Sequence, residues 1–127
     1  MQNPVKFILV VEDDPSLSMV MSRHLTALGY MVLTAASFRE AADQLAVRPA
    51  LLVLDIALPD ATGWDVAAWL ESVQQAVPIV VISGRPPLAA GMTRFHPVAF
   101  LLKPFAIGDL VQVIQTHVPA PVGAFGA

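Results

Sequence analysis

The sequence contains no cysteine and few charged residues. Charged side chains make up 13% of the 127 residues, whereas hydrophobic ones make up 56%. Without cysteine the chain has no disulfide bonds and no thiolate metal sites, and a reducing cytoplasm is the location we expect. The low charge and high apolar content exclude an intrinsically disordered chain, so we expect a compact globular protein.

Positive charge is also scarce. Lys and Arg total seven, they are not clustered, and the formal net charge is -3. Nucleic-acid backbones are bound through clustered Lys and Arg, so this balance argues against direct DNA or RNA binding. No apolar run approaches the roughly 18 to 20 residues of a membrane span, and residues 1–6 lack signal-peptide architecture. We expect no membrane segment.

Short apolar runs alternate with amphipathic segments along the chain. Continuous apolar runs, typical of parallel strands buried on both faces, cover residues 7–11, 51–54 and 79–82. Residues 31–34 and 99–102 form weaker runs of similar length. Helical spacing of apolar residues predicts helices over 15–28, 38–45, 62–73 and 107–118.

This alternation predicts an α/β fold, because short strands joined by helical crossovers form a parallel sheet covered on both faces. We expect a doubly wound five-stranded parallel sheet in one domain, residues 1–118. Residues 119–127 are rich in Pro, Gly and Ala and are interpreted as a tail or linker stub. Functional groups should lie beyond the carboxyl ends of the strands.

The segment between the fourth and fifth strands favours helix formation only weakly. Pro86 and Pro87 fit only the first turn of a helix, Gly91 interrupts the helical pattern, and Pro97 prevents its continuation. We therefore predict a fourth helix that is short or irregular, with at most about two turns between Pro87 and Arg94.

Acidic residues follow two of the predicted strands. Glu12, Asp13 and Asp14 come directly after the first strand, and Asp55 ends the third. Carboxylates gathered at one sheet edge repel one another unless a cation lies among them, and hard oxygen ligands suit Mg²⁺. A magnesium and phosphate site is predicted there, although each aspartate alone fits equally well as a helix cap or turn residue.

Two further polar residues end the last two strands. Ser83 supplies a hydroxyl donor and Lys103 a cation, and both suit phosphate. Pro104 follows the lysine, and a cis bond there would turn the lysine toward the sheet edge. A trans proline that simply ends the strand would account for the sequence equally well.

Four segments in this order resemble response-regulator receiver domains. They are Val-Val-Glu-Asp-Asp at 10–14, Leu-Asp-Ile-Ala-Leu-Pro-Asp-Ala-Thr-Gly at 54–63, Val-Ile-Ser-Gly at 81–84, and Phe-Leu-Leu-Lys-Pro-Phe at 100–105. No single segment is specific, but the ordered combination is, and the resemblance covers about residues 6–118. It implies the flavodoxin-like receiver fold, with strand order 2-1-3-4-5.

The resemblance also implies roles for the acidic residues. Asp55 would be the phosphoacceptor, and Glu12 and Asp13 would form the acidic pair. The metal site for Mg²⁺ would consist of Asp13, Asp55 and the Ala57 carbonyl, with Glu12 beside them. Position 57 also argues against a phosphohydrolase of the haloacid-dehalogenase kind. Such enzymes have an Asp-x-Asp motif, whose second acid protonates the leaving group, whereas this chain has Ala57 two residues after Asp55.

At the last two strands the resemblance implies phosphate contacts and a switch. Ser83 would hydrogen-bond one phosphoryl oxygen and Lys103 would pair with another. Ser83 and Phe100 would be the switch residues, and the bond before Pro104 would be cis.

The function implied is two-component phosphorelay signalling. A histidine kinase or histidine phosphotransfer protein would phosphorylate Asp55, which would switch the face formed by helix four, strand five and helix five. That face would bind a partner, a second copy or an output domain. The chain would be a regulatory domain rather than an enzyme, promoting its own phosphorylation and slow autodephosphorylation. A receiver-like docking module that signals without phosphorylation is the alternative.

Overall fold

Strands and helices alternate along the whole chain in the computed structural model, which describes residues 7–86 and 89–120. The elements are β1 (Phe7–Val11), α1 (Pro15–Ala27), β2 (Met31–Ala35), α2 (Phe38–Gln44), the 3-10 turn η1 (Leu45–Val47), β3 (Leu51–Asp55), α3 (Gly63–Ser72), β4 (Ile79–Ser83), α4 (Ala89–Phe95), β5 (Ala99–Leu102) and α5 (Ile107–His117). Each strand matches its predicted run to within one residue. Most of the predicted tail, residues 121–127, lies outside the described residues.

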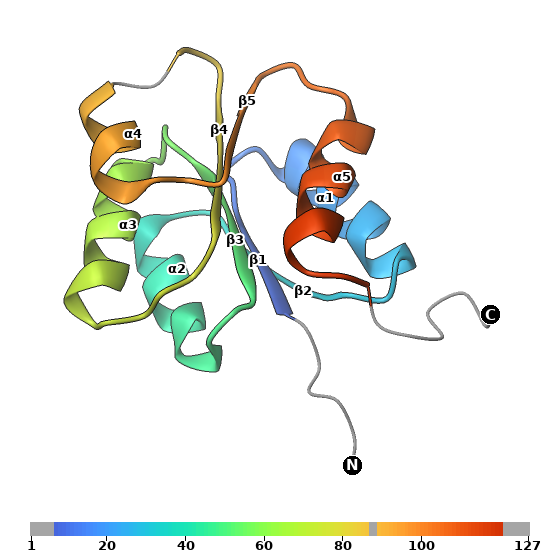
Figure 1. The fold of residues 1–127 in the computed structure, drawn as a ribbon, viewed down its shortest axis with the longest axis horizontal. Helices are drawn as coiled ribbons and strands as arrows, with labels where there is room; N and C mark the ends of the chain where they lie inside the picture. The colour runs from blue at the N-terminus through green and yellow to red at the C-terminus, as the bar shows by residue number, and fades with distance from the viewer. Residues whose placement is uncertain (1–6, 87–88, 121–127) are drawn as a thin grey trace.

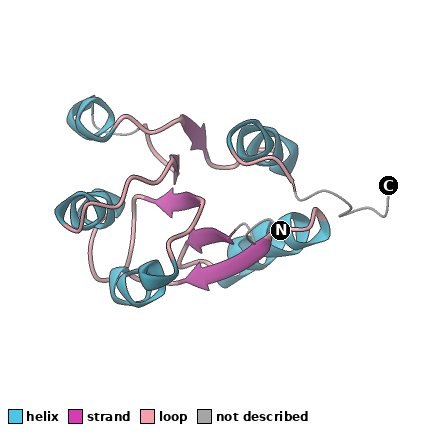
Figure 2. Ribbon diagram, turned by 60° about the horizontal axis from the view of Figure 1, so that its bottom comes forward, coloured by secondary structure: helices cyan, strands magenta, loops and turns pink. Residues whose placement is uncertain are grey.

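The strands form one parallel sheet in the order β2-β1-β3-β4-β5. Helices α1 and α5 cover one face of the sheet, and α2, α3 and α4 cover the other (Figure 1). Figure 2 shows the sheet between these two helical layers. The predicted doubly wound fold and its strand order are confirmed.

Both faces of the central strands are buried, which explains why these strands are continuous apolar runs. Along β1, Ile8 and Val10 pack toward α1 and α5, whereas Leu9 and Val11 pack toward α2 and α3. All four side chains are fully buried. Successive side chains of a strand point to opposite faces, so two covered faces require an unbroken apolar sequence.

Helix α4 has seven residues and is short, as predicted. The predicted start at Pro87 lies outside the described residues. The prediction that Gly91 interrupts the helix was wrong, because α4 passes through this residue. A Cβ at Gly91 would lie 2.4 Å from Cε2 of Trp64, so the missing side chain lets α4 approach α3 closely.

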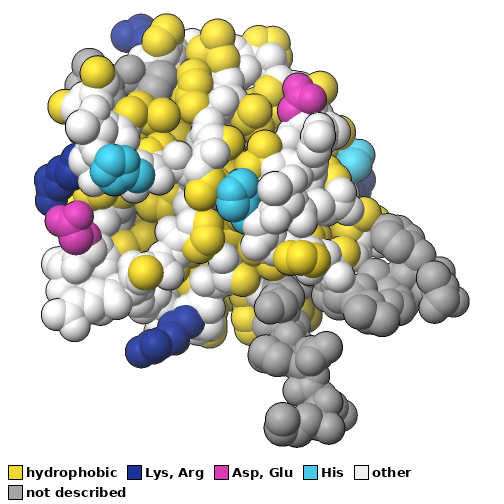
Figure 3. Space-filling view, viewed as in Figure 1, with side chains coloured by type: hydrophobic (Ala, Val, Ile, Leu, Met, Phe, Trp, Pro, Cys, Tyr) yellow, Lys and Arg dark blue, Asp and Glu magenta, His cyan; other side chains and the backbone are white. Residues whose placement is uncertain are grey.

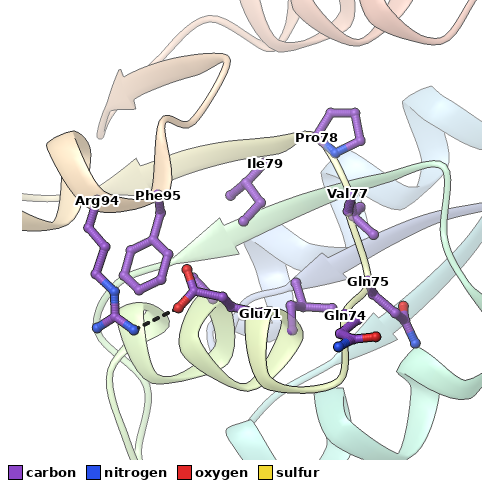
Figure 4. A pocket seen from close by; sticks show the side chains of 11 residues that line it. Glu71, Gln74, Gln75, Val77, Pro78, Ile79, Arg94 and Phe95 are labelled. Carbon is purple, nitrogen blue, oxygen red and sulfur yellow. Dashed lines mark hydrogen bonds and ion pairs between the residues drawn. The ribbon is translucent and has the colours of Figure 1, made fainter.

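Aromatic stacking and an ion pair hold α4 against α3. The rings of Trp64 and Phe95 stack with centroids 5.8 Å apart and an interplanar angle of 11°. Arg94 lies over Phe95 and pairs with Glu71 at 2.9 Å (Figure 4). Glu71, Arg94 and Phe95 border a groove of about 670 Å³ that reaches Ile79, at the opposite end of β4 from Ser83.

Charged residues make up only 13% of the chain. On the face shown in Figure 3, Lys and Arg side chains are scattered among apolar and uncharged groups. In residues 7–86 and 89–120, no helix combines the length and apolar character needed to cross a membrane.

Candidate functional site

The carboxyl ends of β1 and β3 bring three acidic residues together. Glu12 and Asp13 follow β1 and Asp55 ends β3, and these two strands are paired neighbours. One carboxylate oxygen from each residue lies within 4.8 Å of the other two. Glu12 and Asp55 are only 1% and 2% exposed, whereas Asp13 is open to solvent.

Asp14 does not join this cluster. Its Oδ1 accepts a hydrogen bond of 3.0 Å from the amide of Ser16 and caps α1. The amide of Asp14 donates to Oε2 of Glu12 at 3.0 Å, which orients the buried carboxylate. The helix-cap interpretation therefore applies to Asp14, and the other three acids remain available for a ligand.

Lys103 reaches the acidic cluster from the end of β5. Its Nζ lies 2.6 Å from Oε1 of Glu12 and donates to Oδ2 of Asp55 at 3.0 Å. The amide of Lys103 donates to the carbonyl of Ser83 at 2.8 Å, and the Lys103–Pro104 bond is cis. Three carboxylates against one ammonium leave an excess of negative charge at the site.

Burial and the neighbouring charges shift the pKa values of Glu12 and Lys103. Desolvation raises the pKa of Glu12 from 4.5 to about 7, although Lys103 favours the carboxylate. Burial alone would lower the pKa of Lys103, but the carboxylates of Glu12 and Asp55 outweigh it and raise that pKa. An additional cation beside Glu12 would favour its ionised form.

The arrangement fits a hard divalent cation. Within the described part of the chain, the buried Oε1 of Glu12 has the ammonium of Lys103, 2.6 Å away, as its one polar partner. The nearby oxygens of Asp13 and Asp55 complete a set of hard ligands. These three acids could therefore hold a metal ion.

The loop after β3 places backbone groups beside Asp55. The amide of Ala57 donates to Oδ1 of Asp55 at 3.0 Å, so both oxygens of this carboxylate are fixed. Ala57 also forms an isolated antiparallel bridge with Thr62. The predicted carbonyl ligand is thus on a loop that folds back next to the Asp55 carboxylate.

Ser83 and Phe100 lie on the neighbouring strands. Ser83 ends β4, is 8% exposed, and accepts a hydrogen bond of 3.1 Å at Oγ from the amide of Arg85. Phe100 is half-buried in β5 and packs on the apolar layer beneath α2, α3 and α4. The predicted switch residue Phe100 therefore lies in the apolar layer and not in the acidic cluster.

Gly63, the last residue of the 54–63 segment, is tightly constrained in position. A Cβ on Gly63 would lie 2.5 Å from the backbone oxygen of Asp55 and 3.0 Å from Cα of Ile56. The first residue of α3 thus presses against the backbone of Asp55. The one sign of this constraint in the sequence is the glycine that ends the 54–63 segment.

Comparison with known proteins identifies the family of this chain. Residues 8–115 match the family described as the response regulator receiver domain. The response regulator MprA of Mycolicibacterium vanbaalenii is 36% identical over 111 residues, which are 85% of this chain and 48% of that protein. The chain therefore spans about half the length of the curated relatives that it matches.

Solved structures show the same fold. The chemotaxis protein CheY4 of Vibrio cholerae has a TM-score of 0.81 at 24% identity, covering 91% of this chain and 100% of that one. A CheY-like receiver domain protein from Methanospirillum hungatei has a TM-score of 0.82 at 24% identity, covering 89% and 93%. On the match over residues 8–115, the chain belongs to the response regulator receiver domain family.

Proposed function

We propose that this regulatory domain accepts a phosphoryl group on Asp55 in a Mg²⁺-dependent reaction of a two-component system in the cytoplasm. The observation that carries the proposal is the state of the Asp55 carboxylate. It is buried, its two oxygens are fixed by Lys103 and by the Ala57 amide, and the acids Glu12 and Asp13 stand beside it. A histidine kinase or histidine phosphotransfer protein would be the donor, since response regulators are among the relatives.

In the proposed reaction an oxygen of Asp55 attacks the phosphorus of a phosphohistidine. A P–O bond to Asp55 forms as the P–N bond of the donor breaks, and the imidazole leaves and takes up a proton. Lys103 pairs with one phosphoryl oxygen and Ser83 donates a hydrogen bond to another. Slow autodephosphorylation follows when water attacks the phosphorus and the Asp55 carboxylate is released.

The acidic residues have a complementary role. Asp13, Asp55 and the Ala57 carbonyl would hold Mg²⁺, with Glu12 beside them. The bound ion would neutralise charge on the phosphoryl oxygens. Glu12 and Asp13 keep the edge negative, so phosphate is accepted there only together with a cation.

Incubation with acetyl phosphate tests the proposal directly. With Mg²⁺ present, intact-mass measurement should show a species heavier by one phosphoryl group, because the aspartate needs no other protein for the displacement. Chelation of Mg²⁺ with EDTA should abolish that species. Failure to gain the group at any Mg²⁺ concentration would favour the alternative, a docking module that signals without phosphorylation.

Lys103→Ala and Asp13→Asn should separate phosphate contact from metal binding. Removing the ammonium should slow labelling at least about tenfold, because no cation then meets that phosphoryl oxygen, while Mg²⁺ still binds.

Asp13→Asn should instead weaken Mg²⁺ binding, since a neutral amide oxygen attracts the ion less. Calorimetric Mg²⁺ titration and labelling rates report the two effects. Equal Mg²⁺ affinity of Asp13→Asn and wild type would remove Asp13 from the ligand set.

The proposed switch links the site to the face formed by α4, β5 and α5. Ser83 ends β4 and Phe100 is half-buried on the adjacent strand β5, and movement of the hydroxyl toward the phosphoryl group would leave space for the ring. The altered face would serve a partner, a homodimer or an output domain. Amide exchange over residues 89–102 should slow when beryllofluoride and Mg²⁺ are added. Asp55→Asn is the control, and unchanged exchange in wild type would count against the switch.

A further inference from the structure

The loop between β3 and α3, residues 56–62, is called the acceptor loop here. Backbone hydrogen bonds secure its base: Ile56 donates to Ile82 at 3.2 Å, and Gly63 donates to Ile56 at 2.8 Å. The bridge between Ala57 and Thr62 closes the loop above that base. These bonds fix where the loop begins and ends, but not where its tip lies relative to the rest of the domain.

Asp60, at the tip, is bonded to a distant helix. Its Oδ1 accepts from the amide of Phe38 at 2.8 Å, and its Oδ2 accepts from the amide of Arg39 at 3.2 Å. These are the first two residues of α2, whose amides have no partner within the helix. The two amides, that of Phe38 foremost, lower the pKa of Asp60. Asp60 therefore joins the acceptor loop to α2 as a charged cap.

Helix α2 also has an N-cap residue next to it in sequence, so Asp60 is not its only cap. Ser37 is the N-cap residue, and its Oγ accepts from the amide of Glu40 at 3.1 Å. Ser37 satisfies a different amide of the first turn and belongs to the segment that precedes the helix. Both residues stabilise the start of α2, but only Asp60 also restrains the acceptor loop.

We propose that Asp60 is a positioning residue for phosphoryl transfer, which holds the acceptor loop against α2. The inference rests on the proposed phosphorylation of Asp55. Three residues before Asp60, the amide of Ala57 fixes one oxygen of Asp55, and the carbonyl of Ala57 is the proposed backbone ligand. A loop freed at its tip displaces both groups, and small displacements at a metal or reacting centre are costly.

A comparison of Asp60→Ala with Ser37→Ala tests this role. Each variant removes a side chain that accepts hydrogen bonds from amides in the first turn of α2. Thermal unfolding should therefore show similar, modest losses of stability. Mg²⁺ affinity, measured by calorimetry, and the labelling rate with acetyl phosphate should fall about tenfold in Asp60→Ala alone. Asp60→Asn keeps one amide oxygen as an acceptor and should recover part of both values.

The outcomes separate this inference from the proposed function. Equal Mg²⁺ affinities and labelling rates in Asp60→Ala and Ser37→Ala would overturn the positioning role and leave Asp60 as a helix cap only. If wild type gains no phosphoryl group, the proposed function fails. The Mg²⁺ titrations then still decide the positioning role, since a tenfold loss confined to Asp60→Ala supports it and equal affinities refute it.

Discussion

Asp55→Asn is expected to abolish phosphorylation by acetyl phosphate while the domain stays folded. A carboxamide oxygen is neutral and is not an effective nucleophile toward phosphorus, so the displacement has no acceptor. The substitution also removes one of the three acidic groups from the proposed metal site and reduces its attraction for Mg²⁺. Because the side chains have nearly the same shape, packing around this buried position should change little.

Intact mass followed over time, at saturating Mg²⁺, measures the effect. Asp14→Asn is a matched control, because it makes the same chemical change at an exposed carboxylate that caps α1 and lies outside the cluster. This control should be labelled at the wild-type rate. Undiminished labelling of Asp55→Asn would show that another residue is the acceptor.

Gly63→Ala is expected to lower the free energy of unfolding and to slow labelling. The new Cβ would meet the backbone oxygen of Asp55 at 2.5 Å, and backbone atoms cannot rotate away as a flexible side chain can. Overpacking of this kind costs about 1–3 kcal/mol, and moving the start of α3 away would strain the hydrogen bond from the Gly63 amide to Ile56, next to Asp55. Stability and phosphoryl transfer should therefore decline together.

Gly108→Ala provides the comparison, since it makes the same substitution in the first turn of α5. Apart from its chain neighbours and the nearby backbone of its own helix, no described atom lies within 4 Å of the Cβ that it adds. Alanine is the better helix former, so this variant should be as stable as wild type or up to about 1 kcal/mol more stable. Urea unfolding of both proteins decides the matter. Equal stabilities would mean that α3 does not press against Asp55.

The sheet and the acidic edge were predictable because their signals are local. A strand covered on both faces must be apolar throughout, and residues 7–11, 51–54 and 79–82 show that pattern. In a parallel sheet the residues that follow such strands meet at one edge. The approach of Asp55 to Glu12 and Lys103 therefore follows from the order of the strands.

Contacts between helices and loops were not predictable in the same way. The bond from Phe38 to Asp60 joins residues 22 positions apart, and an aspartate after proline in a turn needs no distant partner. Gly91 was interpreted as a helix breaker from its residue type alone. Its closeness to Trp64 could not be predicted, because that contact depends on how α3 and α4 pack. Such contacts depend on the relative placement of elements, which periodicity along the chain does not encode.

The stack of Trp64 on Phe95 gives the protein an intrinsic optical reporter. Indole emission depends on the polarity and the quenching groups around the ring, and this ring lies between α3 and α4. Any displacement of α4 would change those surroundings without an attached dye. The chain has two tryptophans, so replacing Trp69 with phenylalanine would leave the fluorescence of one ring, at the boundary between the two helices. The emission of that ring, followed over time, would then report the motion of α4 in solution.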